Sequence, residues 1–159
     1  MDGMKFCAMY ALSQAKSDEN EDKAIEIAKM SSEMYYKVLL RKGDINNDIK
    51  IEESPLHPCI RSRLRLKALH CMIKLASIPS FEKEITRHHF LLLSIFIQDV
   101  CYYVRRGFLD KVIRNTFNQS IPSNYNVIPF MTIHDVDADI VATAGTYINS
   151  VFRKLNQGE

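Results

Sequence analysis

Apolar residues recur along most of the chain at intervals of three and four, the spacing that lines them up on one face of a helix. Between residues 20 and 40, for example, Ala24, Ile27, Ala28 and Ser31 follow this spacing. No segment shows the strict alternation of apolar and polar residues that a half-buried strand requires. The pattern therefore predicts an all-α protein.

Start and stop signals divide this pattern into seven predicted helices. Asp18 followed by Glu21 has the sequence of a capping box, and Gly43 can supply a left-handed stop. The first three predicted helices run over about 2–16, from Asp18 to Gly43 and over 58–77. The next two run from Thr86 through Ile97 and from Asp99 to about Thr116. The sixth starts at Ser123 or Asn124, where Pro129 would bend or delay the helix, and the seventh runs from Asp137 to Leu155. Residues 43–56 form a predicted acidic loop. We expect the run 90–97 to be buried, since it is apolar nearly all round.

A repeated motif links these helices: an apolar helix ending in Asp, a turn, and then an apolar residue followed by Arg. The segment LLLSIFIQDVCYYVRR carries it in full, with Asp99 before Val104 and Arg105. It recurs in FMTIHDVDADIVA, where Asp135 takes the Asp position and Val141 replaces the arginine. We expect the Asp to cap the second helix of each pair, and the Arg to reach the Asp of its own or a neighbouring repeat.

An earlier copy, CIRSRLRLKAL, keeps Leu64 and Arg65 but has Cys59 at the Asp position. The apolar positions 64, 104 and 140 are 40 and 36 residues apart, the period of HEAT repeats. The motif and its period predict a HEAT-repeat α-α superhelix of stacked antiparallel helix pairs. Residues 1–159 would form a single segment of about three to four pairs.

Charge is distributed unevenly, although the formal net charge is only +2. Residues 57–116 carry 11 Lys and Arg against 4 Asp and Glu, between two acidic ends. The candidate partner-binding residues in this part are Arg61, Arg63, Arg65, Lys67, Tyr102, Tyr103, Arg106 and Lys111. The basic side chains could form a stripe that binds an acidic peptide, an inositol polyphosphate or DNA, or they could simply solvate helix faces. Each tyrosine could anchor a peptide or pack on the next hairpin.

Residue patterns of catalytic and metal sites are absent from the sequence. There is no GxSxG elbow, no glycine-rich phosphate loop and no HExxH or zinc-finger spacing, so we expect neither an enzyme, a metal nor a cofactor. The four cysteines form no CxxC pair and are expected to be small core residues in a reducing compartment. No signal peptide and no run of about 20 apolar residues is present, which predicts an intracellular protein without a membrane span.

From Ser62 to Leu155 the chain resembles one HEAT-repeat family, the cohesin-associated regulators named for precocious dissociation of sisters. The resemblance rests on SRLRLKALHCMIKLASIPSFEKEIT, IQDVCYYVRRGFLDKV and IPSNYNVIPFMTIHD in that order, and is most specific from Asp99 to Arg106. It implies a nuclear, chromatin-associated scaffold without catalytic residues. Such a scaffold would bind the kleisin subunit of cohesin and act with the releasing factor Wapl. The alternative is a basic helical module that binds nucleic acid or another polyanion.

Overall fold

The computed structural model describes residues 2–14, 21–46 and 50–156, and throughout these ranges the regular structure is helical. The α-helices are α1 (Asp2–Gln14), α2 (Glu21–Leu40), α3 (Pro58–Leu75), α4 (Pro79–Glu82), α5 (Arg87–Ile95), α6 (Tyr102–Phe117), α7 (Val127–Phe130) and α8 (Ala138–Asn156). Short 3-10 turns η2 (Ile51–Glu53), η3 (Phe96–Gln98) and η4 (Ser123–Asn126) connect them. The predicted all-α, HEAT-type fold is confirmed. The predicted cap at Asp18, the end of the first predicted helix and residues 47–49 of the acidic loop lie outside the described residues.

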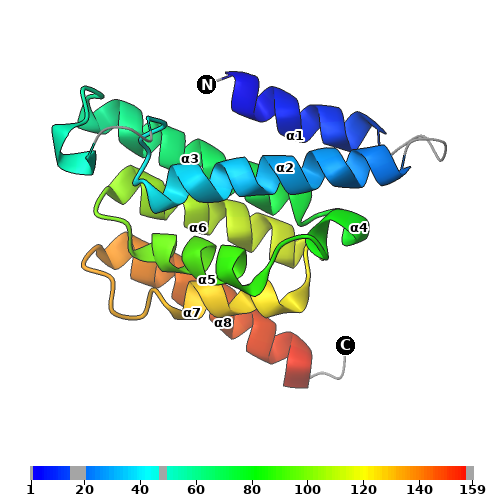
Figure 1. The fold of residues 1–159 in the computed structure, drawn as a ribbon. Helices are drawn as coiled ribbons and strands as arrows, with labels where there is room; N and C mark the ends of the chain where they lie inside the picture. Colours follow the sequence, from blue (N-terminus) through cyan, green and yellow to red (C-terminus); the bar gives the residue numbers. More distant parts are fainter. Residues whose placement is uncertain (1, 15–20, 47–49, 157–159) are drawn as a thin grey trace. The chain divides into compact units, whose positions relative to one another are not determined.

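The chain divides into two compact units, residues 1–94 and 95–159. In the first unit, α1 packs along α2 and α3, and α2 also contacts α3 and α4 (Figure 1). Ala8 and Ala11 of α1 are fully buried, which lets the backbones of the neighbouring helices approach closely. Tyr35 of α2 is also buried, and its hydroxyl donates to the carbonyl oxygen of Met4 at 2.5 Å. This hydrogen bond ties α2 to α1, and burial raises the pKa of the phenol well above its usual range.

Helix α2 ends in a Schellman motif. The N–H of Gly43 donates to the carbonyl of Val38 at 2.8 Å, and the N–H of Lys42 donates to that of Leu39 at 2.9 Å. The predicted left-handed stop is therefore present, but two residues share it: Lys42 has φ 52° and Gly43 has φ 90°. Only glycine fits at position 43, since a Cβ there would lie 2.2 Å from the carbonyl oxygen of Arg61.

Two segments of the chain differ from their predicted form. Thr86 caps α5 as predicted, with its hydroxyl accepting from the N–H of His89 at 3.3 Å. The run 90–97 is only partly buried, however: Leu93 and Ile97 are almost inaccessible, but Leu91 and Ile95 are 48% and 57% exposed. The helix predicted from residue 123 onward is only the turn η4 followed by four residues of α7, because a proline at position 129 has no N–H for a continuous helical ladder.

In the second unit, α6 contacts η3, η4, α7 and α8, and α7 also contacts α8. Phe108, Leu109 and Val112 of α6 are fully buried, as are Ile128 of α7 and Ile140 of α8. Their spacing along each helix is the three-and-four pattern expected from the sequence.

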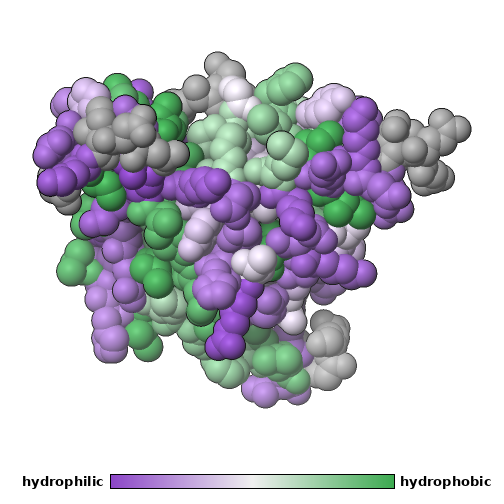
Figure 2. Space-filling view, viewed as in Figure 1, coloured by the Kyte–Doolittle hydropathy of each residue, from purple (hydrophilic) through white to green (hydrophobic). Residues whose placement is uncertain are grey.

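The surface shown in Figure 2 is mainly polar over α2, whereas apolar residues gather over α1 at the top of the view. Phe6 and Met9 of α1 are 67% and 48% exposed. Among the described residues, no helix is long and apolar enough to cross a membrane.

Candidate partner-binding surfaces

Arg105 occupies the centre of the helix-pair turn in the second unit, and its side chain is almost completely buried. One guanidinium nitrogen, Nη1, donates to the carbonyl oxygen of Asp99 at 2.7 Å. The Nε atom lies 2.9 Å from a carboxylate oxygen of Asp135, and Nη2 pairs with Asp137. Arg105 thus reaches the backbone of its own repeat and the carboxylates of the following one, as the motif predicted.

Asp99 and Asp135 adopt the same local turn, in which each carboxylate accepts the backbone N–H two residues later. Asp99 accepts from Cys101 and Asp135 accepts from Asp137, at 2.8 and 2.9 Å. The expectation that Asp99 caps α6 directly is wrong, because the residue at the N-cap position is Cys101. Asp99 lies two residues earlier and fixes the turn that leads into the helix.

A matching pattern of burial relates α3 to α6 at an interval of 40 residues. Five buried positions of α3 have a buried counterpart on α6: Leu64, Arg65, Ala68, Leu69 and Met72 correspond to Val104, Arg105, Phe108, Leu109 and Val112. Helix α3 also buries Cys71, Ile73 and Leu75. Arg65 also donates from Nη1 to a backbone carbonyl at the end of the preceding helix, that of Lys42, at 2.9 Å. The repeat predicted from Leu64 and Val104 is therefore present in the structure.

Cys59, in contrast, does not take the Asp position of the first repeat. It lies in the first turn of α3, because α3 extends four residues further before Leu64 than α6 extends before Val104. The Asp role belongs to Asp44, which is 1% exposed and accepts the N–H of Asn46 at 2.8 Å. Sequence reasoning missed Asp44 because the loop 47–57 separates it from α3; its position directly after Gly43 was the available signal.

The four basic candidates on α3 differ in their surroundings. Arg65 is 7% exposed and bonded to the chain, and Arg61 donates from Nη1 to the carbonyl of Ile51 at 3.2 Å. Lys67 is half-buried and Arg63 is exposed. Among the described residues, Arg63 has neither an ion pair nor a hydrogen bond from its side chain. Arg63 is therefore the basic side chain that α3 presents most openly.

On α6, Tyr102 and Arg106 are engaged with α8. The Tyr102 hydroxyl donates to a carboxylate oxygen of Asp139 at 2.7 Å, and Arg106 Nη1 lies 3.0 Å from the same oxygen. Arg106 also pairs with Asp110 at 3.2 Å. The hydrogen bond from Tyr102, followed by the backbone N–H of Ile140 and the charge of Arg106, lowers the pKa of Asp139. These contacts join α6 to α8 and partly neutralise the arginine.

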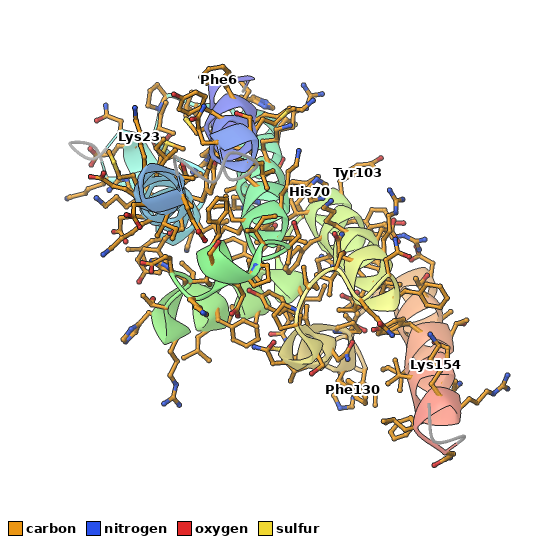
Figure 3. All side chains as sticks on the ribbon, turned by 90° about the vertical axis from the view of Figure 1, so that its right-hand side faces the viewer. Phe6, Lys23, His70, Tyr103, Phe130 and Lys154 are labelled. Atoms are coloured by element: carbon orange, nitrogen blue, oxygen red, sulfur yellow. The ribbon has the colours of Figure 1, made fainter. Side chains whose placement is uncertain are left out.

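Tyr103 is 77% exposed and projects away from α6 (Figure 3). Lys111, in contrast, is half-buried and has a partner within the protein. The rings of Tyr103 and Tyr102 pack edge to face, with their centroids 5.5 Å apart. Because Tyr102 is itself bonded to Asp139, the exposed ring stands on a fixed support. No group of three or more His, Cys, Asp or Glu side chains in the described part of the chain is placed to hold a metal.

The whole chain, residues 1–159, matches the profile of the Sister chromatid cohesion protein PDS5 family. The chain belongs to this family. Over 91 residues it is 33% identical to Sister chromatid cohesion protein PDS5 homolog A of Homo sapiens and to homolog A-B of Xenopus laevis, and 32% identical to homolog B of Mus musculus. Each alignment covers 57% of this chain and 6% of the relative. The chain therefore corresponds to a small part of the length of these PDS5 proteins.

Proposed function

We propose that this PDS5 segment is a non-catalytic scaffold in sister-chromatid cohesion. It binds the kleisin subunit of cohesin and, together with the releasing factor Wapl, helps to set how long cohesin stays on chromatin. This role places the protein in the nucleus. The proposed role in sister-chromatid cohesion is supported by the family match and by relatives whose names contain sister chromatid cohesion.

The observation that carries the proposal is the equivalence of Arg63 and Tyr103. Each is exposed and directly precedes a buried pair, Leu64 with Arg65 or Val104 with Arg105. In each case the buried arginine donates to a backbone carbonyl outside its own helix. This contact fixes the helical turn that carries the neighbouring exposed residue. A side chain on such a fixed backbone loses little further freedom on binding, which favours affinity.

The two positions suit a peptide that carries both acidic and apolar residues. Arg63 offers five N–H donors that match a carboxylate, and Tyr103 offers a large ring with a polar tip. In the first unit, Arg61 and Arg65 bond to backbone carbonyls near Arg63, and Lys67 adds positive charge on the same helix. In the second unit, Arg106 bonds to α8 near Tyr103, and Lys111 lies on the same helix as Tyr103. We propose one contact of this kind in each of the two repeats.

The alternative is that the same residues bind a nucleic acid or another polyanion. It is favoured by the excess of positive charge in residues 57–116. Phosphate-driven binding weakens steeply with salt, since each neutralised phosphate releases about one counterion. Binding that rests on an apolar anchor is much less sensitive to salt.

Fluorescence anisotropy separates the two functions. A labelled kleisin segment and a labelled DNA duplex are titrated with the protein at low and moderate salt. We expect saturable kleisin binding at both salt concentrations, and weak DNA binding that is lost at moderate salt. Tyr103→Ala should raise the Kd for kleisin about tenfold or more, the range expected for an anchoring tyrosine.

Matched controls test whether the loss of kleisin binding depends on the position of the substituted residue rather than on its type. Arg114→Ala removes an exposed arginine from the last turn of α6, and Phe152→Ala removes a 50% exposed ring from α8. Both should leave kleisin binding unchanged, whereas Arg63→Ala should weaken it most at low salt. Equal losses from the controls, or kleisin binding that disappears at moderate salt, would count against the scaffold function and in favour of a polyanion module.

A further inference from the structure

We propose that the groove between α1 and α2 binds a segment of a partner protein in which an arginine, flanked by apolar residues, pairs with the buried carboxylate of Asp44. This contact is separate from the one proposed for Arg63 and Tyr103 and does not depend on it. Three features support it: a carboxylate oxygen without a donor, an arginine at the equivalent place in the second unit, and the apolar lining of the groove.

One oxygen of the Asp44 carboxylate lacks a hydrogen-bond donor inside the fold. Oδ1 accepts the N–H of Asn46 at 2.8 Å, whereas Oδ2 is buried and accepts no hydrogen bond from the described residues. Burial of such an oxygen is costly, because it has lost its hydration without gaining a donor in exchange. A donor that reaches Oδ2 therefore recovers free energy that the fold leaves unused.

The second unit shows which group takes the equivalent place. Asp135, like Asp44, accepts the backbone N–H two residues later, and its carboxylate lies 2.9 Å from Nε of Arg105. Arg105 belongs to α6, which is separated from the Asp135 turn by one α-helix, α7. Helix α1 is separated from the Asp44 turn in the same way, by α2. The one basic residue of α1, Lys5, is exposed and does not line the groove, so α1 offers no arginine to Asp44.

The groove that contains Asp44 has room for several side chains. Its volume is about 880 Å³, within the range of about 300–1,000 Å³ that is typical of ligand sites. Its apolar lining includes Met4 and Phe6 of α1 and Met30, Met34 and Val38 of α2. Phe6 and Met30 are 67% and 68% exposed, so the groove is open to solvent (Figure 3). Because methionine side chains adapt to the shape of their neighbours, this lining suits the apolar residues beside an arginine.

The other charged residues of the groove limit the positive charge that a partner can carry. Glu33 pairs with Lys37 at 3.8 Å and with His89 at 3.2 Å. Arg41, which has a partner within the protein, adds positive charge at the end of α2. These cations repel a strongly basic segment, so we expect a single arginine. Its planar guanidinium matches a carboxylate and is less strongly hydrated than the ammonium group of lysine, which makes it easier to bury beside Asp44.

Fluorescence anisotropy with labelled, capped pentapeptides tests the contact in the folded 159-residue protein. Each peptide has a central arginine flanked by Leu, Phe or Val and is paired with one in which citrulline, a neutral isostere, replaces the arginine. We expect saturable binding of arginine peptides and a Kd about tenfold or more higher for citrulline, the effect of losing a hydrogen bond between charged groups. The proposal is overturned if no arginine peptide binds, if citrulline peptides bind equally well, or if Tyr103→Ala abolishes binding.

Substitutions in the protein test whether Asp44 is the partner of the arginine. Asp44→Asn keeps an oxygen for the N–H of Asn46, so the turn is retained. It should weaken the arginine peptide about tenfold and change the Kd of the citrulline peptide little. Met30→Ala should weaken both peptides, whereas Met9→Ala, at an exposed position of α1 outside the groove, should weaken neither. Equal effects of Asp44→Asn on the two peptides, or of the two methionine variants, would refute the assignment.

NMR spectra of the protein with carbon-13 methyl-labelled methionine locate the bound peptide. The signals of Met4, Met30 and Met34 should shift on addition of the arginine peptide, while those of Met9 and Met131 stay in place. The reverse pattern would place the peptide elsewhere and overturn the proposal. Sedimentation velocity of the free protein tests a second copy of the chain as the occupant. A dimer that Met30→Ala separates would assign the groove to self-association instead, whereas a monomer leaves the groove open to a partner as proposed.

Discussion

Replacing Arg105 by methionine should destabilise the protein far more than replacing the adjacent Arg106. The side chain of Arg105 is 9% exposed and that of its partner Asp135 is 5% exposed, at an ion-pair distance of 2.9 Å. Methionine fills similar space but leaves a buried carboxylate without a counter-charge and the carbonyl of Asp99 without its donor. Breaking a buried pair from one side costs about 3–5 kcal/mol.

The same substitution at Arg106 provides the matched control. This arginine is 34% exposed, and its partners Asp110 and Asp139 are 44% and 48% exposed. Pairs as accessible as these contribute about 0–1 kcal/mol. The two variants remove the same group from neighbouring positions of one helix, so their difference isolates the effect of burial.

Urea unfolding, monitored by far-UV circular dichroism, measures the free energy of unfolding of both variants. Equal slopes of this free energy against urea concentration would confirm that both variants unfold in the same transition. A loss of about 3–5 kcal/mol corresponds to a fall in Tm of about 10 °C for a chain of this length. Arg105→Met combined with Asp135→Asn should be more stable than Arg105→Met alone, because the asparagine carries no charge and can still accept the N–H of Asp137.

Equal stability losses for Arg105→Met and Arg106→Met would refute this reasoning. So would a loss below about 1 kcal/mol for Arg105→Met, the upper range of an exposed pair. If the double variant were less stable than Arg105→Met, the unpaired carboxylate would not be the source of the destabilisation.

Three further predictions follow from the described contacts. Tyr102→Phe should raise the pKa of Asp139, measured by carbon-13 NMR of its carboxyl group. A carboxyl group whose pKa is lowered by folding stabilises the folded protein at pH values above its unfolded pKa of about 3.9. The stability difference between Tyr102→Phe and the native protein should therefore disappear as the pH falls below about 3.9 and through the pKa of Asp139 in the folded protein. An unchanged pKa of Asp139 in the variant would show that Tyr102 does not lower it. Gly43→Ala should destabilise the protein by at least about 1 kcal/mol in urea unfolding, because its Cβ would meet the carbonyl oxygen of Arg61 at 2.2 Å; native-like stability would contradict the close approach. Gln119→Gly should raise stability by up to about 1 kcal/mol, since Gln119 has φ 53° at the end of α6, and a loss of stability would show that its side chain matters more than the strain.

The sequence by itself determined the features that depend on short-range spacing. The three-and-four periodicity of apolar residues specified the helices, because a helix brings those positions to one face. The spacing from Asp99 to Arg105 specified the turn between paired helices, since its main contacts are within a few residues or one repeat away. Gly43 likewise marked the left-handed end of α2, which it shares in the structure with Lys42.

Only the tertiary structure decided which charged residues serve the fold and which face the solvent. Arg63 and Arg65 are the same residue type two positions apart, and packing buries one while it exposes the other. Asp44 takes the Asp position in place of Cys59, and the motif on α3 does not reveal it because the loop 47–57 separates Asp44 from that helix. Residues 123–130 form a turn and a single short helix because their backbone hydrogen bonds must be satisfied around Pro129 within the space left by α6 and α8. Each of these outcomes depends on contacts with residues distant in sequence, which the spacing of apolar residues does not reveal.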